Sequence, residues 1–238
     1  MSERQIYEFV ALDRPLGELE MAELRGVSTR AEISATRFRN EYQWGDLKAD
    51  PRELLVRYFD VHMYSASWGE RRFMVRLPAD RVDVAALRLY LGDRPDVLAR
   101  VGEHHVLELT SDSDCDEGGG EEVVDGAALL GVRAGLLHGD MRGPYLAWLL
   151  AVQGDRVARG EREPAVPPGL ERLSAPLVAL ARFLRIDADL LAAAASAWGV
   201  GVRTAGQLRA CAGALAEARL RACSRGVTRG GVSLVRGV

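Results

Sequence analysis

The chain of 238 residues is 48% apolar, which is enough to fill one large core or two small ones. Its formal net charge is −3. Lys48 is the single lysine in the sequence, so Schiff-base and P-loop chemistry are excluded unless Lys48 performs them. Three widely spaced cysteines without a Cys-x-x-Cys pair predict reduced thiols. The lack of an apolar run of about 18 residues, or of a signal-like start, predicts a cytoplasmic protein with no membrane partner.

The first expected elements are two strands joined through a helix. Residues 6–12 are apolar except for Glu8, which is typical of a central strand covered on both faces. A short amphipathic helix is expected from Leu16 to about Gly26. Residues 36–44 then alternate between an aromatic face and a charged face, as a half-buried strand does. This order predicts a parallel pair of strands with a right-handed crossover.

The segment from residue 38 to residue 73 holds eight of the fifteen Phe, Trp and Tyr residues, and we expect the rest of the chain to be organised around it. Asp50 and Pro51 read as the N-cap and first position of a helix. Apolar residues then recur at three- and four-residue spacing. The pattern predicts one helix running to about residue 67, with His62 on its aromatic face.

The next elements complete a first domain. Residues 72–77 alternate as a strand does, with Phe73 expected in the core and Met74 outside it. A helix is expected at residues 82–91, followed by a hairpin that turns at Gly102-Glu103. Together these elements predict an α+β domain at residues 1–110, in which helices pack on a mixed sheet.

Residues 111–125 predict an acidic, glycine-rich linker, because they contain seven acidic residues and no arginine or lysine. The alternate aspartates that begin at Asp112 resemble a calcium loop. However, Glu117 and Val123 stand where such a loop needs a glycine and a bidentate glutamate. No metal site is therefore predicted.

Residues 126–222 predict an antiparallel, all-α helical bundle, followed by a flexible basic tail at residues 223–238. This part of the chain has fifteen basic and eight acidic residues, a net charge of +7. The helices are expected at residues 127–137 and 144–152, after Ser174, from Asp187 to Trp198, and from Thr204 or Gly206 to about Ala222.

Several phrases of the sequence resemble an uncharacterised family of bacterial proteins whose N-terminal segment is similar to YEFxAxDRPL. The resemblance covers residues 5 to about 198 and implies a bacterial, cytoplasmic origin, but no functional residue. The phrases are Tyr7-Glu8-Phe9, Ala11, Asp13-Arg14-Pro15-Leu16, Tyr42-x-Trp44-Gly45-Asp46 and Asp187-x-Asp189-Leu190-Leu191-Ala192.

No complete catalytic, cofactor or metal motif is present, so no catalytic residue or cofactor is predicted. The candidate binding residues are aromatic and acidic: Trp44, Asp46, His62, Tyr64 and Trp68. Burial near an acid would tune the pKa of His62, and exposed Trp and Tyr side chains are frequent at binding hot spots. The alternatives are a histidine satisfied at the edge of the core and a plain aromatic core.

The favoured hypothesis is a non-catalytic interaction or structural subunit with a protein partner or a second copy of itself. Whether the chain is an enzyme stays open, with a non-catalytic role preferred. The first alternative is a small-molecule-binding protein or enzyme with a site near Trp44, His62 and Trp68. The second is polyanion or nucleic-acid binding by the arginine-rich C-terminal half.

Overall fold

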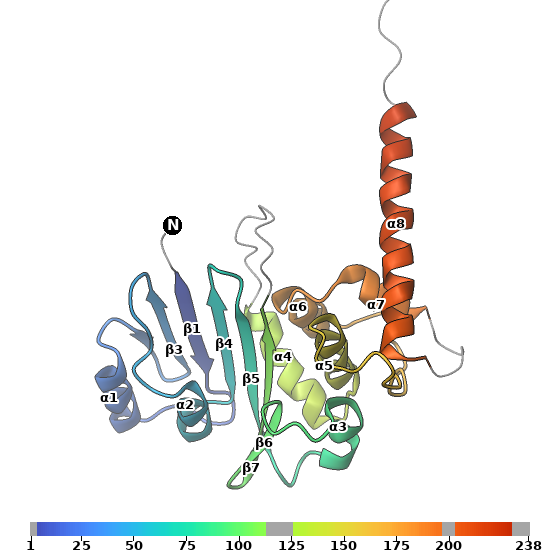
Figure 1. Ribbon diagram of the computed structural model, residues 1–238. Coiled ribbons are helices and arrows are strands. Elements are labelled where there is room, and N and C mark those ends of the chain that lie inside the picture. Colours follow the sequence, from blue (N-terminus) through green and yellow to red (C-terminus); the bar gives the residue numbers. More distant parts are fainter. Residues whose placement is uncertain (1–3, 113–125, 197–202, 230–238) are drawn as a thin grey trace, which may run out of the picture.

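The protein is built around one antiparallel sheet. The computed structural model describes residues 4–112, 126–196 and 203–229, and within them seven strands form a sheet in which every neighbouring pair is antiparallel (Figure 1). The chain is therefore an α+β protein, as predicted, but its sheet is antiparallel instead of mixed. In sheet order the strands are β2 (Glu32–Ile33), β3 (Arg37–Tyr42), β1 (Gln5–Val10), β4 (Val61–Ala66), β5 (Arg71–Pro78), β7 (His104–Ser111) and β6 (Leu98–Val101).

The predicted parallel pairing of the first two long strands is wrong. Helix α1 (Glu18–Val27) leads from β1 into the two-residue strand β2, and a tight turn at residues 34–37 then reverses the chain into β3. β3 fills the place between β1 and β2, with Phe38 opposite Phe9. A strand as short as β2 carries no periodicity of its own, so the reversal is hidden in the sequence.

The helix predicted to run to residue 67 is also wrong beyond its second turn. Helix α2 spans Pro51–Tyr58, and the Asp50 carboxylate caps it as predicted, accepting hydrogen bonds from the amides of Arg52 and Glu53 at 2.7 and 3.1 Å. The chain then becomes β4, which carries His62. Because β4 is buried on both faces, its apolar residues do not alternate strictly with polar ones, and the pattern matches helical spacing as well as strand spacing.

The two faces of the sheet are covered by different helices. On β4, His62 and Tyr64 pack with the apolar cluster of α1 and α2, whereas Val61 and Met63 belong to the cluster that includes α3 (Val84–Leu91) and α4 (Gly126–Leu137). We call these the α2 face and the α4 face. Met74, predicted to lie outside, is buried because both faces are covered at β5.

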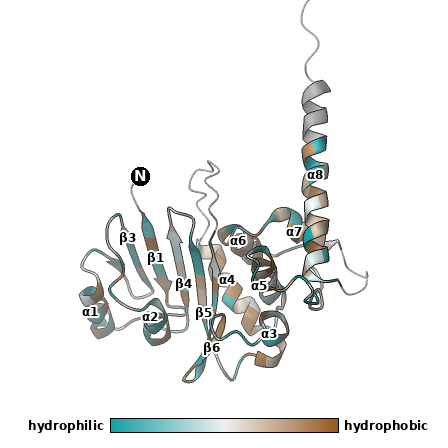
Figure 2. Ribbon diagram, viewed as in Figure 1, coloured by the Kyte–Doolittle hydropathy of each residue, from teal (hydrophilic) through white to brown (hydrophobic). Residues whose placement is uncertain are grey.

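Of the C-terminal helices, α4 packs on β4 and β5, and the others pack on α4, on α3 or on one another. These helices are α4, α5 (Arg142–Gln153), α6 (Ala175–Phe183), α7 (Ala188–Ala195) and α8 (Ala205–Arg229). One apolar cluster runs without interruption from Phe73 of the sheet through Leu129 to Leu146 and Trp148 of α5, so a separate all-α bundle is not confirmed. Figure 2 shows that α5 is largely hydrophobic whereas β3 is largely hydrophilic. The domain limits stay predictions, and most of the predicted acidic linker, residues 113–125, lies outside the described residues with its aspartate motif.

Several predicted element ends are found in the structure. The hairpin of β6 and β7 turns at Gly102, and Asp187 caps α7 through the amides of Asp189 and Leu190. Thr204 and Gln207 cap the start of α8 reciprocally. Helix α8 continues to Arg229 instead of ending near Ala222. In the part of the chain that is described, no helix combines the length and the apolar character needed to cross a membrane.

A buried carboxylate ties the layers together. Asp60, between α2 and β4, is 1% exposed and accepts hydrogen bonds from the amides of Leu12 and Asp13 and from the Arg76 guanidinium at 2.7, 2.9 and 2.7 Å. Arg133 of α4 lies 3.4 Å from Asp60 and donates two hydrogen bonds to the Asp13 carboxylate. Burial alone raises the pKa of Asp60. The hydrogen bonds that Asp60 accepts from the two amides and from Arg76 outweigh burial and hold that pKa below its ordinary value.

Asp60→Asn is expected to lower the free energy of unfolding by about 3 kcal/mol, because it leaves the buried Arg76 and Arg133 without their shared anion. Urea denaturation at neutral pH measures the change. Asp93→Asn is the matched control, since that side chain is largely exposed and its ion pair with Arg88, at 3.4 Å, lies at the surface. Equal stabilities of the two variants would contradict the role given to Asp60.

Candidate functional site

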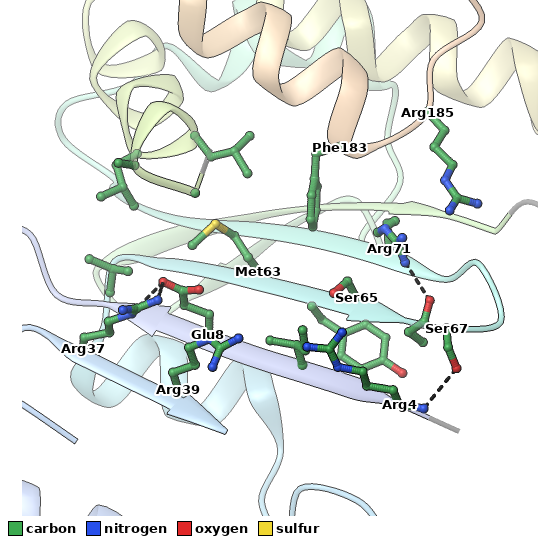
Figure 3. Close-up of a pocket in the computed structure, with 18 of the residues that line it drawn as sticks. Arg4, Glu8, Arg37, Arg39, Met63, Ser65, Ser67, Arg71, Phe183 and Arg185 are labelled. Atoms are coloured by element: carbon green, nitrogen blue, oxygen red, sulfur yellow. Dashed lines mark hydrogen bonds and ion pairs between the residues drawn. The ribbon is translucent and has the colours of Figure 1, made fainter. Parts of the chain in front are cut away.

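An open cleft of about 940 Å³ lies on the α4 face of the sheet, between β3, β1 and β4 on one side and α4 and α6 on the other (Figure 3). We call it the arginine cleft. It exists because α4, with α6 packed against it, covers β4 and β5 but leaves the α4 face of β1 and β3 open. Its lining includes Arg4, Ile6, Glu8, Val10, Arg37, Arg39, Met63, Ser65, Ser67, Arg71, Leu129, Leu130, Phe183 and Arg185.

Five arginines line the cleft, whereas Glu8 is the single acidic residue among its described lining residues. Strand alternation places Arg37 and Arg39 on the same face of β3, opposite in direction to the buried Phe38. The sequence predicts this charged face, but it does not predict that helices distant in the sequence lie beside it. A strand face that the sequence predicts to be solvated is therefore the floor of a cleft.

Nearby acids hold some of these arginines. The Arg37 guanidinium pairs with Glu8 at 2.8 Å, and Arg4 donates two hydrogen bonds to Glu41 at 2.7 and 3.0 Å. The hydrogen bond from Arg4 lowers the pKa of Glu41. Arg39 lies farther from Glu41, at 4.0 Å. Arg71 donates to the carbonyl oxygens of Ala66 and Glu70.

Arg185 stands apart because its backbone is left-handed, with φ of 53°. It follows the last turn of α6, where the Arg185 amide donates to the Arg182 carbonyl at 3.0 Å and the Ile186 amide donates to the Ala181 carbonyl at 2.9 Å. These two bonds form a Schellman motif, whose left-handed position usually carries glycine. Figure 3 shows the Arg185 side chain reaching into the cleft. Among the residues described, no side chain accepts a hydrogen bond from its guanidinium.

Apolar side chains fill the space between the arginines. Met63 rises from the floor, and Phe183 descends from α6 above it (Figure 3). Leu129 and Leu130 extend this wall along α4, and Ile6 extends the floor along β1. The cleft thus combines an apolar interior with cationic groups, the usual composition of a site for an organic ligand.

Three of the predicted binding residues meet on the α2 face, and the two tryptophans lie apart from them. The Tyr7 hydroxyl donates to Asp46 at 2.5 Å, and the Tyr7 ring lies 4.7 Å from Tyr64 and 6.1 Å from His62, centre to centre. Burial, followed by the hydrogen bond to Asp46, raises the pKa of Tyr7 well above its ordinary value. Burial raises the pKa of Tyr64 to about 12.

His62 is sealed in packing. It has no exposed surface, its ring stacks on Phe9 at 4.0 Å, and its Nδ1–H donates to the Glu8 carbonyl at 3.0 Å. Burial lowers the pKa of His62 to about 3, so the ring is neutral at physiological pH. In this arrangement the side chain is part of the core and does not reach a ligand.

Trp44 and Trp68 are exposed, at 77% and 44%. Trp44 follows the end of β3 and Trp68 follows the end of β4, so both stand at the end of the sheet where β1 begins. Their role in binding stays a prediction. Within the described ranges, no three His, Cys, Asp or Glu side chains form a group that would hold a metal ion.

A scan against protein-family models, a search of curated proteins and a search of solved structures each returned no match. The resemblance to a bacterial family stays a prediction. Function is therefore argued from the geometry of the cleft alone.

His62→Phe is expected to make stability less sensitive to mild acid. In the unfolded chain the imidazole takes up a proton near pH 6.5, whereas in the folded protein it stays neutral down to about pH 3. In this window the unfolded state therefore binds more protons than the folded state, so the free energy of unfolding falls as the pH is lowered. Between pH 7 and pH 5 the natural chain should lose about 2 kcal/mol more than the variant in urea denaturation. Equal losses would contradict the buried, neutral state; His138→Gln, at an exposed position, is the control.

Arg185→Gly is expected to stabilise the protein by about 0.5 to 1 kcal/mol, because glycine adopts the left-handed conformation without the strain that a Cβ introduces. The melting temperature should rise by about 1 to 3 °C in a chain of this size. Arg185→Ala, which keeps the Cβ, should show no such rise. A fall in stability in the glycine variant would mean that the arginine side chain supports the fold itself.

Proposed function

We propose that the protein binds a small organic anion in the arginine cleft. The observation that carries this proposal is the convergence of five arginines and one glutamate around an apolar cleft of about 940 Å³. Guanidinium groups present paired N–H donors that match a carboxylate or phosphate, and they stay charged at every physiological pH. The volume lies near the upper end of the range for small-molecule sites.

Arg39 and Arg185 are the best candidates to contact the ligand. Arg37 is already paired with Glu8 at 2.8 Å, whereas the acid nearest to Arg39 is 4.0 Å away. The Arg185 side chain is held at the cleft by a backbone conformation that is unfavourable for arginine. Strain of this kind is found where the surrounding structure fixes a functional side chain.

The proposal is for binding without catalysis. Among the described lining residues there is no histidine or cysteine to serve as a general base or nucleophile, and Glu8 is engaged by Arg37. Small-molecule binding is the first alternative predicted from the sequence, with a site near Trp44, His62 and Trp68. The proposed site is instead the arginine cleft on the α4 face of the sheet. Polyanion binding by the C-terminal half stays a prediction; among the arginines of that half whose side chains the structure describes, Arg185 alone lines the cleft.

The interaction or self-association hypothesis is kept as a second candidate, because two large aromatic side chains are exposed at one end of the sheet. Trp44 and Trp68 are the residues such an interface would use, since exposed tryptophans that pack into a partner are frequent hot spots. Neither tryptophan belongs to the described lining of the cleft, so this candidate can be tested separately from ligand binding.

At millimolar concentration and low salt, at least one of phosphate, citrate, benzoate and octanoate is expected to raise the melting temperature by several degrees, whereas benzamide and octanamide should not. Arg185→Gln and Arg39→Gln should each weaken the binding of that anion about tenfold or more by isothermal titration calorimetry, since each removes a charge-assisted hydrogen bond. Added salt should weaken it as well.

The control is Arg182→Gln, three residues earlier on α6, where the side chain is exposed and does not line the cleft. It should bind as the natural chain does. The proposal fails if none of the four anions binds, or if the neutral amides bind as tightly as the acids.

A further inference from the structure

We infer that the ligand is an amphipathic anion, with one acidic head at the Arg185 end of the cleft and an extended apolar tail along its interior. This inference rests on the proposed function and specifies the ligand for the same site. It follows from the unequal distribution of charge and apolar surface between the ends of the cleft.

One end of the cleft is arranged for an acidic head. Arg71 lies opposite Ser65 in the β4–β5 ladder, and Ser65 lies opposite Ile6 of β1, so these residues mark one level of the sheet. Figure 3 shows Arg185 projecting from the end of α6 toward this level. Serine hydroxyls and guanidinium groups are both hydrogen-bond donors to an oxyanion. No acidic side chain belongs to the described lining of this end.

The other end of the cleft is poorly suited to a second acidic group. Arg37 lies opposite Val10 in the β1–β3 ladder, and its guanidinium is paired with Glu8. A carboxylate placed there would meet the Glu8 carboxylate as well as the arginine, and like charges at short distance repel. A ligand with acidic groups at both ends is therefore disfavoured.

Between the two ends, one side of the cleft is apolar and long. Met63 lies midway between the Ile6 level and the Val10 level, and Leu129, Leu130 and Phe183 line the cleft from the helices. Glu8 and Arg39, which lie opposite each other at the Met63 level, belong to the other side of the cleft. Four residues of strand separate these levels, which corresponds to about 13 Å at about 3.3 Å per residue. A phosphate ion or a short-chain acid would leave this surface wet. A tail of roughly ten carbons would cover it.

The test is a series of straight-chain carboxylates from butanoate to decanoate, titrated into the full chain by calorimetry below their micelle-forming concentrations. The dissociation constant should fall about fourfold per added methylene, the factor expected for burial of each CH₂ group. Decanol and inorganic phosphate, which lack the head and the tail respectively, should bind at least tenfold more weakly than decanoate.

Two variants separate the head from the tail. Arg185→Gln should weaken every acid by a similar factor, and by more than Arg39→Gln does. Leu130→Ser, at a partly exposed position on α4, should flatten the dependence of the dissociation constant on chain length. Leu89→Ser, at an exposed site on α3 outside the cleft, is its matched control.

The outcomes distinguish the inference from the proposed function. If phosphate and butanoate bind as tightly as decanoate and depend on Arg185, the amphipathic ligand is wrong and anion binding stands. If no straight-chain acid binds but phosphate, citrate or benzoate does, the amphipathic ligand is again wrong and anion binding stands. If decanol binds as tightly as decanoate, or if none of these anions binds, the proposed function itself is overturned. A length dependence that Leu130→Ser leaves unchanged would also overturn the place given to the tail.

Discussion

The buried Asp60 carboxylate is the interaction on which the arrangement of the layers depends. Removing a carboxylate from water costs several kcal/mol, and the protein offsets this only because two amides and two guanidinium groups surround the side chain. These partners come from the end of β1, from β5 and from α4. A geometry that satisfies all of them at once fixes the exit of the first strand and the position of α4 over the sheet.

The position of α4 in turn creates the arginine cleft. Arg133 anchors the middle of α4 to the Asp13 carboxylate and to the Arg76 carbonyl at 2.8 Å, so the helix lies over β4 and β5 and does not extend over β1 and β3. The uncovered strand β3 presents Arg37 and Arg39 on this face and buries Phe38 on the other. The composition of β3 thus matches the cover it receives: apolar toward the α2 face and charged toward the cleft.

The sequence predicts the elements whose signals are local. The caps at Asp50 and Asp187 and the hairpin at Gly102 follow from short-range hydrogen bonding and turn chemistry, and all three are found. β4 is missed because burial on both faces removes the alternation that identifies a strand. The cleft is missed for a different reason: its residues come from β1, β3, β4, β5, α4 and α6, and no local pattern reports which distant helix stops short of which strand. The sequence signals that were available, the charged face of β3 and the Arg185 that ends α6, have ordinary interpretations on their own.

Arg185 links the end of a helix to the chemistry of the cleft. Its left-handed backbone is held from outside, because Gln153 of α5 donates to the Arg185 carbonyl at 2.9 Å and accepts from the Asp187 amide at 2.8 Å. Asp187 then caps α7. The same short loop therefore ends α6, is hydrogen-bonded to α5 and starts α7. Such surrounding contacts let a conformation that costs an arginine about 1 kcal/mol persist. The left-handed turn also directs the side chain away from the axis of α6, and a helical conformation at this residue would continue the helix instead of ending it. The same left-handed turn therefore ends α6 and places a cation in the cleft. The packing of three helices sets the position of this guanidinium, and with it the position of any ligand group that the guanidinium binds.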